Sequence, residues 1–343
     1  MKALVLEAYN QFVYQEVPAP EMGPDDVLIQ VVACGICGSD VHGMDGSSGR
    51  RIPPVIMGHE AAGMISAMGK DVTGWQVGDR VTFDSTIYCG ECTFCRKGLI
   101  NLCDNRRVLG VSCDDYRQHG AFAEVVAVPK HILYRLPDGL SFEHAAMVEA
   151  VSIAFHAVSR PPITLNDAAV VVGAGMIGLL VVQALRVAGC GTVVAVDLDP
   201  QRLALARQLG ADVALRSDVD DVASNVQALT GGRGADLAFE VVGISPTLQL
   251  ATQCLRKGGA LTCVGNLASR TDFMLQSVVT RQITLYGSCS SCGEYPACLD
   301  MIARGAIKVD PLISAVAPLK EGADWFKRLY AKEPGLMKVI LTP

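Results

Sequence analysis

The apolar positions in the first hundred residues form short runs that are interrupted by turn residues. These runs predict strands over residues 2–6, 26–34, 63–68 and 79–83. Glycine, proline or aspartate stands beside several of the runs, as expected where a chain reverses direction. The pattern is typical of a β-rich domain.

A different spacing begins near residue 141. Apolar residues over 142–158 recur at helical intervals, with Ser141 as a plausible N-cap and Glu143 in the first turn. Beyond residue 167, predicted strands alternate with helices. The strands are expected over 168–172, 192–196, 237–241 and 260–264, with one helix ending near 188 and another over 200–209. This alternation predicts parallel βαβ units with right-handed crossovers.

From about residue 286 the pattern is mixed again, and it ends in a predicted strand over 337–341. We therefore predict an α/β protein of two domains, for which 343 residues is a suitable length. Residues 1–150 and 286–343 would form the β-rich domain. Residues 151–285 would form an inserted, doubly wound domain with a parallel sheet.

The composition excludes several classes of protein. Half of the residues are apolar and only 19% are charged, which excludes a disordered chain or a coiled coil. The net charge is −6 and no basic block is present, so we expect no nucleic-acid partner. The apolar stretch over 168–182 holds three glycines and soon meets Gln183 and Arg186, so we expect no membrane span. The apolar run at the first residues is too short for a secretory signal.

The cysteine content indicates a reducing environment. Thirteen cysteines is an odd number, and several of them cluster tightly in one segment. This distribution favours metal ligands and reduced thiols over a disulfide framework. We therefore expect a cytoplasmic protein.

Four cysteines follow the spacing C-x2-C-x2-C-x7-C, namely Cys89, Cys92, Cys95 and Cys103. Four thiolates within this short segment can close a tetrahedral zinc site with no open position, which is a structural and not a catalytic zinc. An iron–sulfur cluster is the alternative. Zinc is favoured because the bacterial cluster motif has x3 and a proline around its last cysteine, and this segment has neither.

A second group combines a thiol, an imidazole and a carboxylate from separate loops, namely Cys37, His59 and Glu60. Such mixed donors are expected of a catalytic zinc, where three protein groups leave a position for substrate. Two alternatives stay open. His59 can be an ordinary loop histidine, and Cys34 with Cys37 can be a redox pair.

The third motif is a G-x-G-x-x-G directly after a predicted strand, with Gly173, Gly175, Met176, Ile177 and Gly178. Asp197 ends the next predicted strand. Strand, turn, helix and acid together predict a dinucleotide site, because a bare backbone can approach a pyrophosphate and a carboxylate can accept from ribose hydroxyls. A carboxylate here repels a 2′-phosphate, so NAD is expected over NADP, and Arg202 is expected to cover the adenine. A glycine-rich packing motif is the alternative.

Together these motifs resemble those of the zinc-containing medium-chain alcohol dehydrogenase family, from Met1 to Pro343. Within it the chain looks most like the polyol branch, the sorbitol and iditol dehydrogenases and their relatives. The resemblance implies a GroES-like catalytic domain formed by both chain ends around an inserted Rossmann domain. It also implies that Cys37, His59 and Glu60 hold a catalytic zinc.

Other site residues follow from the resemblance alone. Glu149 matches the glutamate of the family's Glu-Pro-Leu motif and is expected to bind the catalytic zinc directly or through its water. Asp40 would orient the His59 ring. Ser39 and His42 match the family's proton relay.

The chain departs from the polyol branch at positions expected to meet substrate. Ser290-Ser291 stand where an Arg-Tyr pair is frequent, Gly43-Met44 stand where aromatic residues are frequent, and Ala150 replaces a proline. Sorbitol itself is therefore not the expected substrate. Residues 113–119 are either a solvated loop or part of the substrate site. The remaining group, Cys289, Cys292 and Cys298, is expected to be buried thiols rather than another metal site.

These features predict a zinc- and NAD-dependent enzyme that oxidises a secondary hydroxyl of a polyol, sugar acid or sugar phosphate to a ketone by hydride transfer. The family implies a homo-oligomer, either a dimer or a tetramer such as a homotetramer. A threonine 3-dehydrogenase-like enzyme is the alternative, although that branch tends to place an aspartate near the Glu149 position. A non-catalytic relative and a zinc-free quinone reductase are disfavoured because no zinc ligand is missing.

Overall fold

The computed structural model describes residues 1–343, and the chain divides into two compact units. The first unit comprises Met1–Glu149, Tyr295–Gly305 and Val309–Pro343. The second comprises Ala150–Glu294 and Ala306–Lys308. The two ends of the chain therefore fold together, and the middle of the chain forms a separate unit.

The first unit is built mainly from strands. They are β1 (Lys2–Ala8), β2 (Gln11–Glu16), β3 (Asp26–Gly35), β4 (Val55–Ile56), β5 (Glu60–Met68), β6 (Arg80–Phe83), β7 (Thr86–Ile87), β8 (Arg107–Val108), β9 (Val111–Ser112), β10 (Arg117–Gln118), β11 (Val125–Pro129), β12 (Leu133–Arg135), β19 (Ile313–Pro318) and β20 (Lys338–Thr342). Each strand predicted in the first hundred residues is present. β5 begins three residues earlier than predicted because Glu60 pairs with Gly35 of β3.

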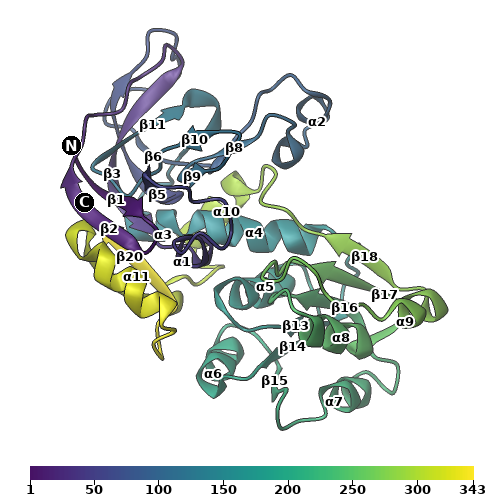
Figure 1. Ribbon diagram of the computed structural model, residues 1–343. Coiled ribbons are helices and arrows are strands. Elements are labelled where there is room, and N and C mark those ends of the chain that lie inside the picture. The colour runs from purple at the N-terminus through teal and green to yellow at the C-terminus, as the bar shows by residue number, and fades with distance from the viewer. The chain divides into compact units, whose positions relative to one another are not determined.

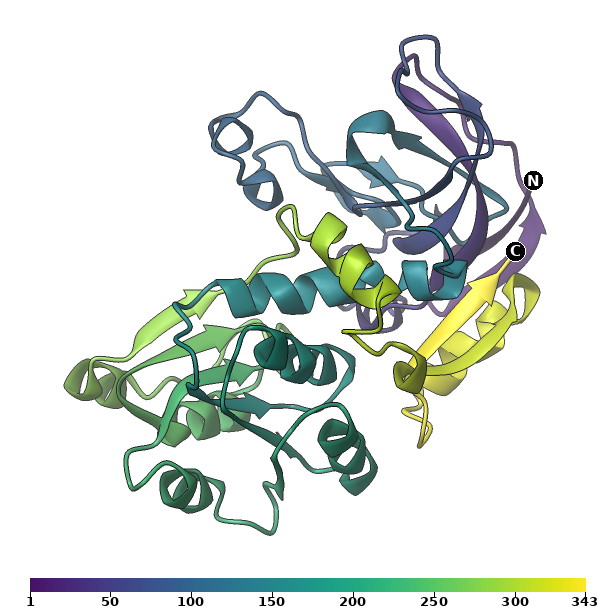
Figure 2. The same ribbon diagram turned by 180° about the vertical axis from the view of Figure 1, so that it is seen from behind.

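A seven-stranded sheet has the order β12-β6-β5-β3-β20-β19, and β11 also pairs with β3. The C-terminal strand β20 runs antiparallel to β3 and pairs Ile340 with Gly35. Both termini lie in this unit, as Figures 1 and 2 show. The last strand therefore lies beside the segment that leads to Cys37.

The helices of this unit are short. They are α1 (Gly38–Gly43), α2 (Thr93–Arg96), α3 (Phe142–Ala146), α10 (Tyr295–Ala303) and α11 (Gly322–Tyr330). The ring of Phe326 on α11 is fully buried and lies 4.3 Å from the ring of Phe12 and 5.7 Å from that of Phe122, measured between centroids. The C-terminal helix thus closes the same apolar core that the first strands begin.

The helix predicted over 142–158 is divided at Met147 into α3 and α4 (Val148–Ser159). Ser141 caps α3 as predicted, and its hydroxyl accepts from the backbone N–H of His144 at 3.2 Å. Because of the division, Glu149 lies in the first turn of a new helix rather than in the middle of a long one.

The second unit is a parallel sheet with helices between its strands. The strands are β13 (Ala168–Val172), β14 (Thr192–Asp197), β15 (Val213–Arg216), β16 (Ala235–Glu240), β17 (Leu255–Cys263) and β18 (Thr284–Gly287). Their order is β15-β14-β13-β16-β17-β18, which is the doubly wound arrangement predicted. The helices are α5 (Met176–Val187), α6 (Pro200–Gln208), α7 (Val222–Leu229), α8 (Ser245–Cys254) and α9 (Leu275–Arg281).

The second unit extends further along the chain than the sequence pattern predicts. Residue 286, the expected start of the returning segment, lies inside β18, and by its contacts the unit extends to Glu294. The apolar stretch over 168–182 is divided between β13 and α5. No helix in the structure has the length and apolar character needed to cross a membrane.

Candidate active site

Cys37, His59 and Glu60 meet where β3 ends and β5 begins. Cys37 is the N-cap of α1, and its sulfur accepts from the backbone N–H of Ser39 at 3.5 Å. The pairing of Gly35 with Glu60 brings the start of β5 beside this cap. As a result, ligand atoms of the three side chains lie within 4.8 Å of one another.

Two glycines make this approach possible. Gly58 has a φ of +93°, a conformation that glycine adopts without strain and that turns the chain into His59. A side chain at Gly35 would collide with the carboxylate of Glu60. The approach of the two motifs therefore depends on Gly58 for its turn and on the missing side chain at Gly35 for space.

Asp40 lies beside the His59 ring. The Asp40 side chain is fully buried, and its Oδ1 lies 3.5 Å from Nδ1 of His59, which leaves Nε2 for a ligand. Burial by itself raises the pKa of Asp40, but His59 and Arg51 bring it well below its usual range. Burial lowers the pKa of His59, whereas Asp40 and Cys37 raise it well above its ordinary value. The surroundings of the ring therefore favour a positive charge at this position.

A buried lysine that the sequence motifs did not reveal lies beside this group. Lys338 on β20 is 2% exposed, forms an ion pair with Glu60, and donates to the carbonyl of Ile36 at 3.1 Å. Burial lowers the pKa of Lys338, but Glu60 more than compensates and raises it. The available signal was a single cation in an otherwise apolar strand.

Glu149 is buried at the start of α4, and it is not a member of the group of three. Its Oε1 accepts from the hydroxyl of Ser85 at 3.5 Å. Burial raises its pKa to about 7, with His59 lowering it and Glu60 raising it. The carboxylate thus lies within the electrostatic reach of two members of the group.

Ser39 and His42 are both exposed on α1. The hydroxyl of Ser39 donates to the sulfur of Cys37 at 3.3 Å, and His42 lies in the last turn of the helix. Ser39 is therefore adjacent to the group of three, and His42 is open to solvent on the same helix.

The donors in this group suit a zinc ion. A thiolate, an imidazole and a carboxylate are ligand types that zinc accepts together, and three of them leave a coordination position for another molecule. The negative surroundings of the His59 ring also fit a cation. Cys37, His59 and Glu60 are thus the residues that would hold the metal.

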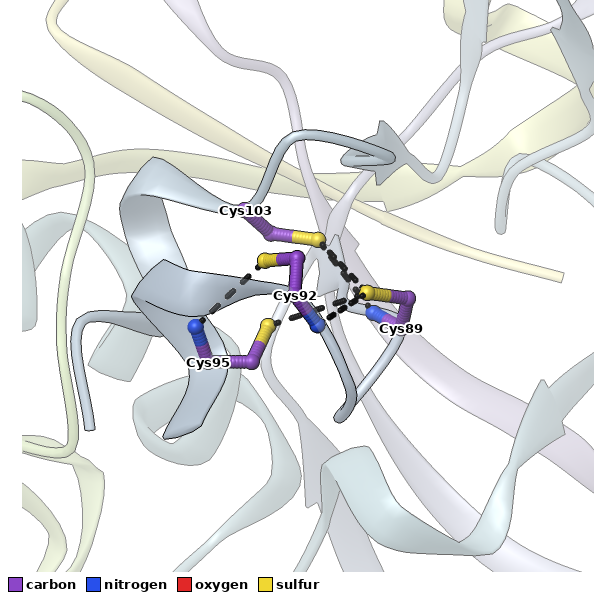
Figure 3. A group of neighbouring side chains, drawn as sticks. All are labelled: Cys89, Cys92, Cys95 and Cys103. Carbon is purple, nitrogen blue, oxygen red and sulfur yellow. Dashed lines mark hydrogen bonds between the residues drawn. The ribbon is translucent and has the colours of Figure 1, made fainter. Parts of the chain in front are cut away.

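The four cysteines of the second motif also converge, as Figure 3 shows. Cys92 is the N-cap of α2, Cys95 lies within that helix, and Cys103 follows a 3-10 turn at Ile100–Leu102. The sulfur of Cys89 lies 3.5 Å from that of Cys103 and 4.0 Å from that of Cys95. All thirteen cysteines of the chain are free thiols.

Backbone N–H groups already point at these sulfurs. Cys89 accepts from the N–H of Cys92 at 3.4 Å, and Cys92 accepts from the N–H of Cys95 at 3.4 Å. Hydrogen bonds from the backbone at Glu91 and Cys92 lower the pKa of Cys89 to about 6. These bonds favour thiolates at Cys89 and Cys92, whereas burial and the neighbouring thiols raise the pKa of Cys95 to about 12. The convergence of four sulfurs fits a closed tetrahedral metal site.

The glycine motif of the second unit joins β13 to α5. Gly173 has a φ of +103°, and a side chain at Gly178 would collide with the carbonyl of Gly173. Gly175 is the N-cap of α5 and has open space where a side chain would stand. Met176 and Ile177 form the first turn, so their backbone N–H groups lie at the positive end of the helix. This geometry suits a pyrophosphate.

Asp197 ends β14 beside this motif. Its Oδ2 accepts from the backbone N–H of Ala174 at 2.7 Å, and its Oδ1 accepts from that of Leu198 at 2.8 Å. Arg202 lies closer to Asp199 than to Asp197, with nitrogen–oxygen distances of 3.6 and 4.0 Å. The carboxylate is thus fixed at the carboxyl end of its strand, where doubly wound folds bind dinucleotides.

The positions where the chain departs from the polyol branch differ in their burial and in the elements to which they belong. Ser291 is buried and Gly43 lies at the end of α1. Residues 113–119 form the connection and second strand of the β9–β10 hairpin. The prediction that Cys289, Cys292 and Cys298 are buried thiols is wrong for Cys289, which is exposed, whereas Cys292 is half-buried and Cys298 is buried. None of the three belongs to either ligand group.

Comparison with known proteins gives the family. Residues 23–138 match the family model of the alcohol dehydrogenase GroES-like domain, and residues 177–304 match that of a zinc-binding dehydrogenase. Sorbitol dehydrogenase of Bacillus subtilis is 32% identical over 348 residues, covering 100% of this chain and 97% of that protein. D-Arabitol-phosphate dehydrogenase of Enterococcus avium is 34% identical over 326 residues, covering 94% and 91%.

Comparison with solved structures supports the same family. A zinc-binding dehydrogenase of Sinorhizobium meliloti bound to NADP superimposes with a TM-score of 0.90 and 32% identity, covering 100% of this chain and 99% of that one. The chain therefore belongs to the zinc-containing medium-chain alcohol dehydrogenase family. Within it the chain is a member of the polyol dehydrogenase branch, and it is an oxidoreductase. The predicted combination of a GroES-like and a Rossmann domain is confirmed.

Proposed function

We propose that this protein is a zinc- and NAD-dependent dehydrogenase that oxidises a secondary hydroxyl of a polyol, a sugar acid or a sugar phosphate to a ketone. The convergence of Cys37, His59 and Glu60 in a chain of this family carries the proposal. The names of the similar proteins, which refer to sorbitol and arabitol phosphate, support the substrate class.

The reaction moves one proton and one hydride. The hydroxyl proton leaves the substrate oxygen, and a nicotinamide cofactor held at the glycine motif and Asp197 would accept the hydride from the same carbon, so that alcohol and NAD⁺ would become ketone, NADH and a proton. Zinc at the group of three would supply Lewis-acid polarisation of the substrate oxygen. The Ser39 oxygen accepts the substrate proton as its own hydroxyl proton moves on, and the exposed His42 releases a proton to solvent.

Glu149 is proposed as a further ligand of this site, bound directly or through a water molecule. Its burial at the start of α4 and its electrostatic coupling to His59 and Glu60 support this role. A buried carboxylate is costly unless a cation or hydrogen-bond donors compensate it, and a metal ion nearby would do so.

NAD is the proposed cofactor because of Asp197. Its carboxylate is only 12% exposed, and the backbone N–H of Ala174 holds it in place, so it cannot easily turn away from a ribose. A negative charge at this position repels a 2′-phosphate. Gly173, Gly175 and Gly178 would admit the pyrophosphate.

Two zinc ions per chain are proposed, one for each ligand group. The four-cysteine site has no open position and would be structural, whereas the group of three would be catalytic.

We also infer a cytoplasmic homo-oligomer, either a dimer or a tetramer. The thirteen free thiols support a reducing compartment. The edge strand β18 exposes Leu285, and the neighbouring α9 exposes Leu275 and Val279, which supports burial of this edge against a second copy.

The proposal is tested by following NADH absorbance with purified, zinc-loaded protein over neutral polyols, aldonates, sugar phosphates and ethanol. We expect turnover of a substrate with adjacent hydroxyls at a secondary carbon, with ethanol a poor substrate. Ethanol as the best substrate, or no turnover of any polyol derivative, would contradict the proposed substrate class.

A further inference from the structure

Arg51 is a buried arginine that neither the family motifs nor the proposed proton path includes. It is 4% exposed and precedes β4. Its backbone is fixed to β9, because the N–H of Ser112 donates to the carbonyl of Arg50 at 3.2 Å and the N–H of Ile52 donates to the carbonyl of Ser112 at 2.9 Å. Arg51 therefore enters the site from a rigid attachment.

The guanidinium of Arg51 binds two neighbours on α1. Its Nε and Nη2 both donate to Oδ1 of Asp40, at 3.1 and 2.8 Å. Nη2 also donates to the hydroxyl oxygen of Ser39 at 3.3 Å. The third nitrogen, Nη1, is directed away and donates to the carbonyl of Arg50 at 3.0 Å.

Both neighbours lie beside the ligand group. Asp40 faces Nδ1 of His59 at 3.5 Å, and Ser39 donates to the sulfur of Cys37 at 3.3 Å. Oδ2 of Asp40 is buried and has no hydrogen-bond partner, so the carboxylate is held through Oδ1 alone. Arg51 thus supplies the two shortest of the contacts that keep Asp40 against the imidazole.

The sequence makes room for this side chain at Gly43. A β-carbon at Gly43 would lie 2.6 Å from Cγ of Arg51, so a larger residue there would displace the arginine stem. The absence of a side chain at Gly43 therefore leaves the space that the stem of Arg51 occupies.

We propose that Arg51 is a positioning residue of the oxidation. Its planar guanidinium ties Asp40 and Ser39 together, and so it fixes the His59 ring for metal binding and the Ser39 hydroxyl for proton transfer. The inference rests on the proposed function for its kinetic part, while its metal-binding part stands on the geometry alone. Because Nη2 donates to Ser39, the serine oxygen can receive negative charge while its own proton moves on.

Two variants of Arg51 separate its effect on metal binding from its effect on proton transfer. Arg51→Met removes the hydrogen bonds to both Asp40 and Ser39. We expect roughly a 10–100-fold loss in the affinity of the group of three for zinc, and a similar loss in kcat. This is the range found when hydrogen-bond partners of metal ligands are removed. Arg51→Lys keeps a charge for Asp40 but lacks the planar fork. We expect it to restore zinc affinity while kcat stays at least tenfold low with little change in KM.

The experiment measures zinc release to a chelator, the visible spectrum after cobalt substitution, and kinetics. Arg50→Met is the matched control, since it removes an exposed arginine one position away, and it should match the wild type in all three. A double-mutant cycle with Ser39→Ala tests the link to the serine. We expect the effects of Arg51→Lys and Ser39→Ala on kcat to be strongly non-additive.

Full additivity in that cycle would overturn the kinetic part, because an arginine with only a structural role would not act through Ser39. Zinc release and a cobalt spectrum unchanged in Arg51→Met would overturn the metal-binding part. If the wild type oxidises no alcohol, the proposed function fails, and the metal measurements still decide whether Arg51 positions His59.

Discussion

At the scale of single residues, Asp197 has the most direct consequence for cofactor choice. Replacing it with serine removes the negative charge and the acceptors offered to ribose hydroxyls. We expect Asp197→Ser to erode the preference for NAD over NADP by about 1–3 kcal/mol, the value of a charged hydrogen bond. The ratio of kcat/KM for the two cofactors measures this preference.

Asp199→Asn is a suitable control for that experiment. Asp199 is the N-cap of α6, and asparagine keeps the cap while removing a nearby charge. A wild-type protein that uses NADP as well as or better than NAD would contradict the assignment to Asp197.

Asp236, which lies outside both groups of proposed metal ligands, allows a test of how the free energy of unfolding depends on pH. Its side chain accepts from the N–H of Ala168 at 2.8 Å and from Nε of Arg256 at 2.5 Å. Burial raises the pKa of Asp236, but Arg256 and this backbone N–H outweigh it and lower the pKa below its ordinary value. A lowered folded-state pKa adds stability above the unfolded-state pKa, and that stability is lost as the pH falls through the folded value.

We therefore expect Asp236→Asn to lower the free energy of unfolding by about 1 kcal/mol at neutral pH, allowing for solvent screening. The difference from the wild type should stay constant above about pH 5 and shrink below about pH 4. Denaturant unfolding across this range measures it. A difference that grows as the pH falls would show that the carboxylate does not stabilise the fold in this way.

The sequence could not reveal the two buried cations of the active site. Lys338 stands alone in an apolar strand, which signals a buried partner, but that partner is Glu60, 278 residues earlier. Arg51 stands next to another arginine and looks like part of a solvated turn. Both were missed because ion-pair partners that are distant in sequence depend on the tertiary fold.

At the scale of elements, the cysteine segment should behave as an independent structural piece. Its ligands come from α2 and the turns on either side, and none is shared with the group of three. We expect Cys103→Ser to lose one zinc and to lower Tm, because structural zinc sites contribute directly to folding. At temperatures below its lowered Tm, Cys103→Ser should still be active, and a further Cys37→Ser substitution should abolish that activity.

Zinc content by elemental analysis and thermal unfolding measure this prediction. Cys113→Ser, a half-buried cysteine outside both groups, is the control and should keep both zinc ions. Iron in the native protein, or unchanged zinc content in Cys103→Ser, would refute a structural zinc in this segment.

The sequence largely predicted which strands and helices form, but it did not predict the residues at which they begin and end. Short apolar runs bounded by turn residues located β1, β3, β5 and β6. The start of β5 at Glu60 is set by pairing with β3, and the division between α3 and α4 at Met147 has no signal in the apolar spacing. Strand pairing and the point where a helix is interrupted depend on tertiary contacts, which the spacing of apolar residues does not show.

At the scale of the whole molecule, the chain is organised as one domain formed by both ends and one inserted parallel domain. The change in pattern near residue 167 located the insertion. The return was harder to locate, because the pattern becomes mixed near residue 286 whereas the second unit continues through β18 to Glu294. The closing of the first unit by β20 is what carries Lys338 to Glu60.

The central claim is that Cys37, His59 and Glu60 form a catalytic zinc site separate from the cysteine segment. The most direct measurement compares zinc content and NADH formation in the wild type, in Cys37→Ser and in Cys34→Ala, a buried cysteine outside both groups. The account predicts that Cys37→Ser keeps one zinc ion and loses turnover, whereas Cys34→Ala keeps two zinc ions and its activity. Turnover by Cys37→Ser with its full zinc content, or a wild type with a single zinc ion, would contradict it.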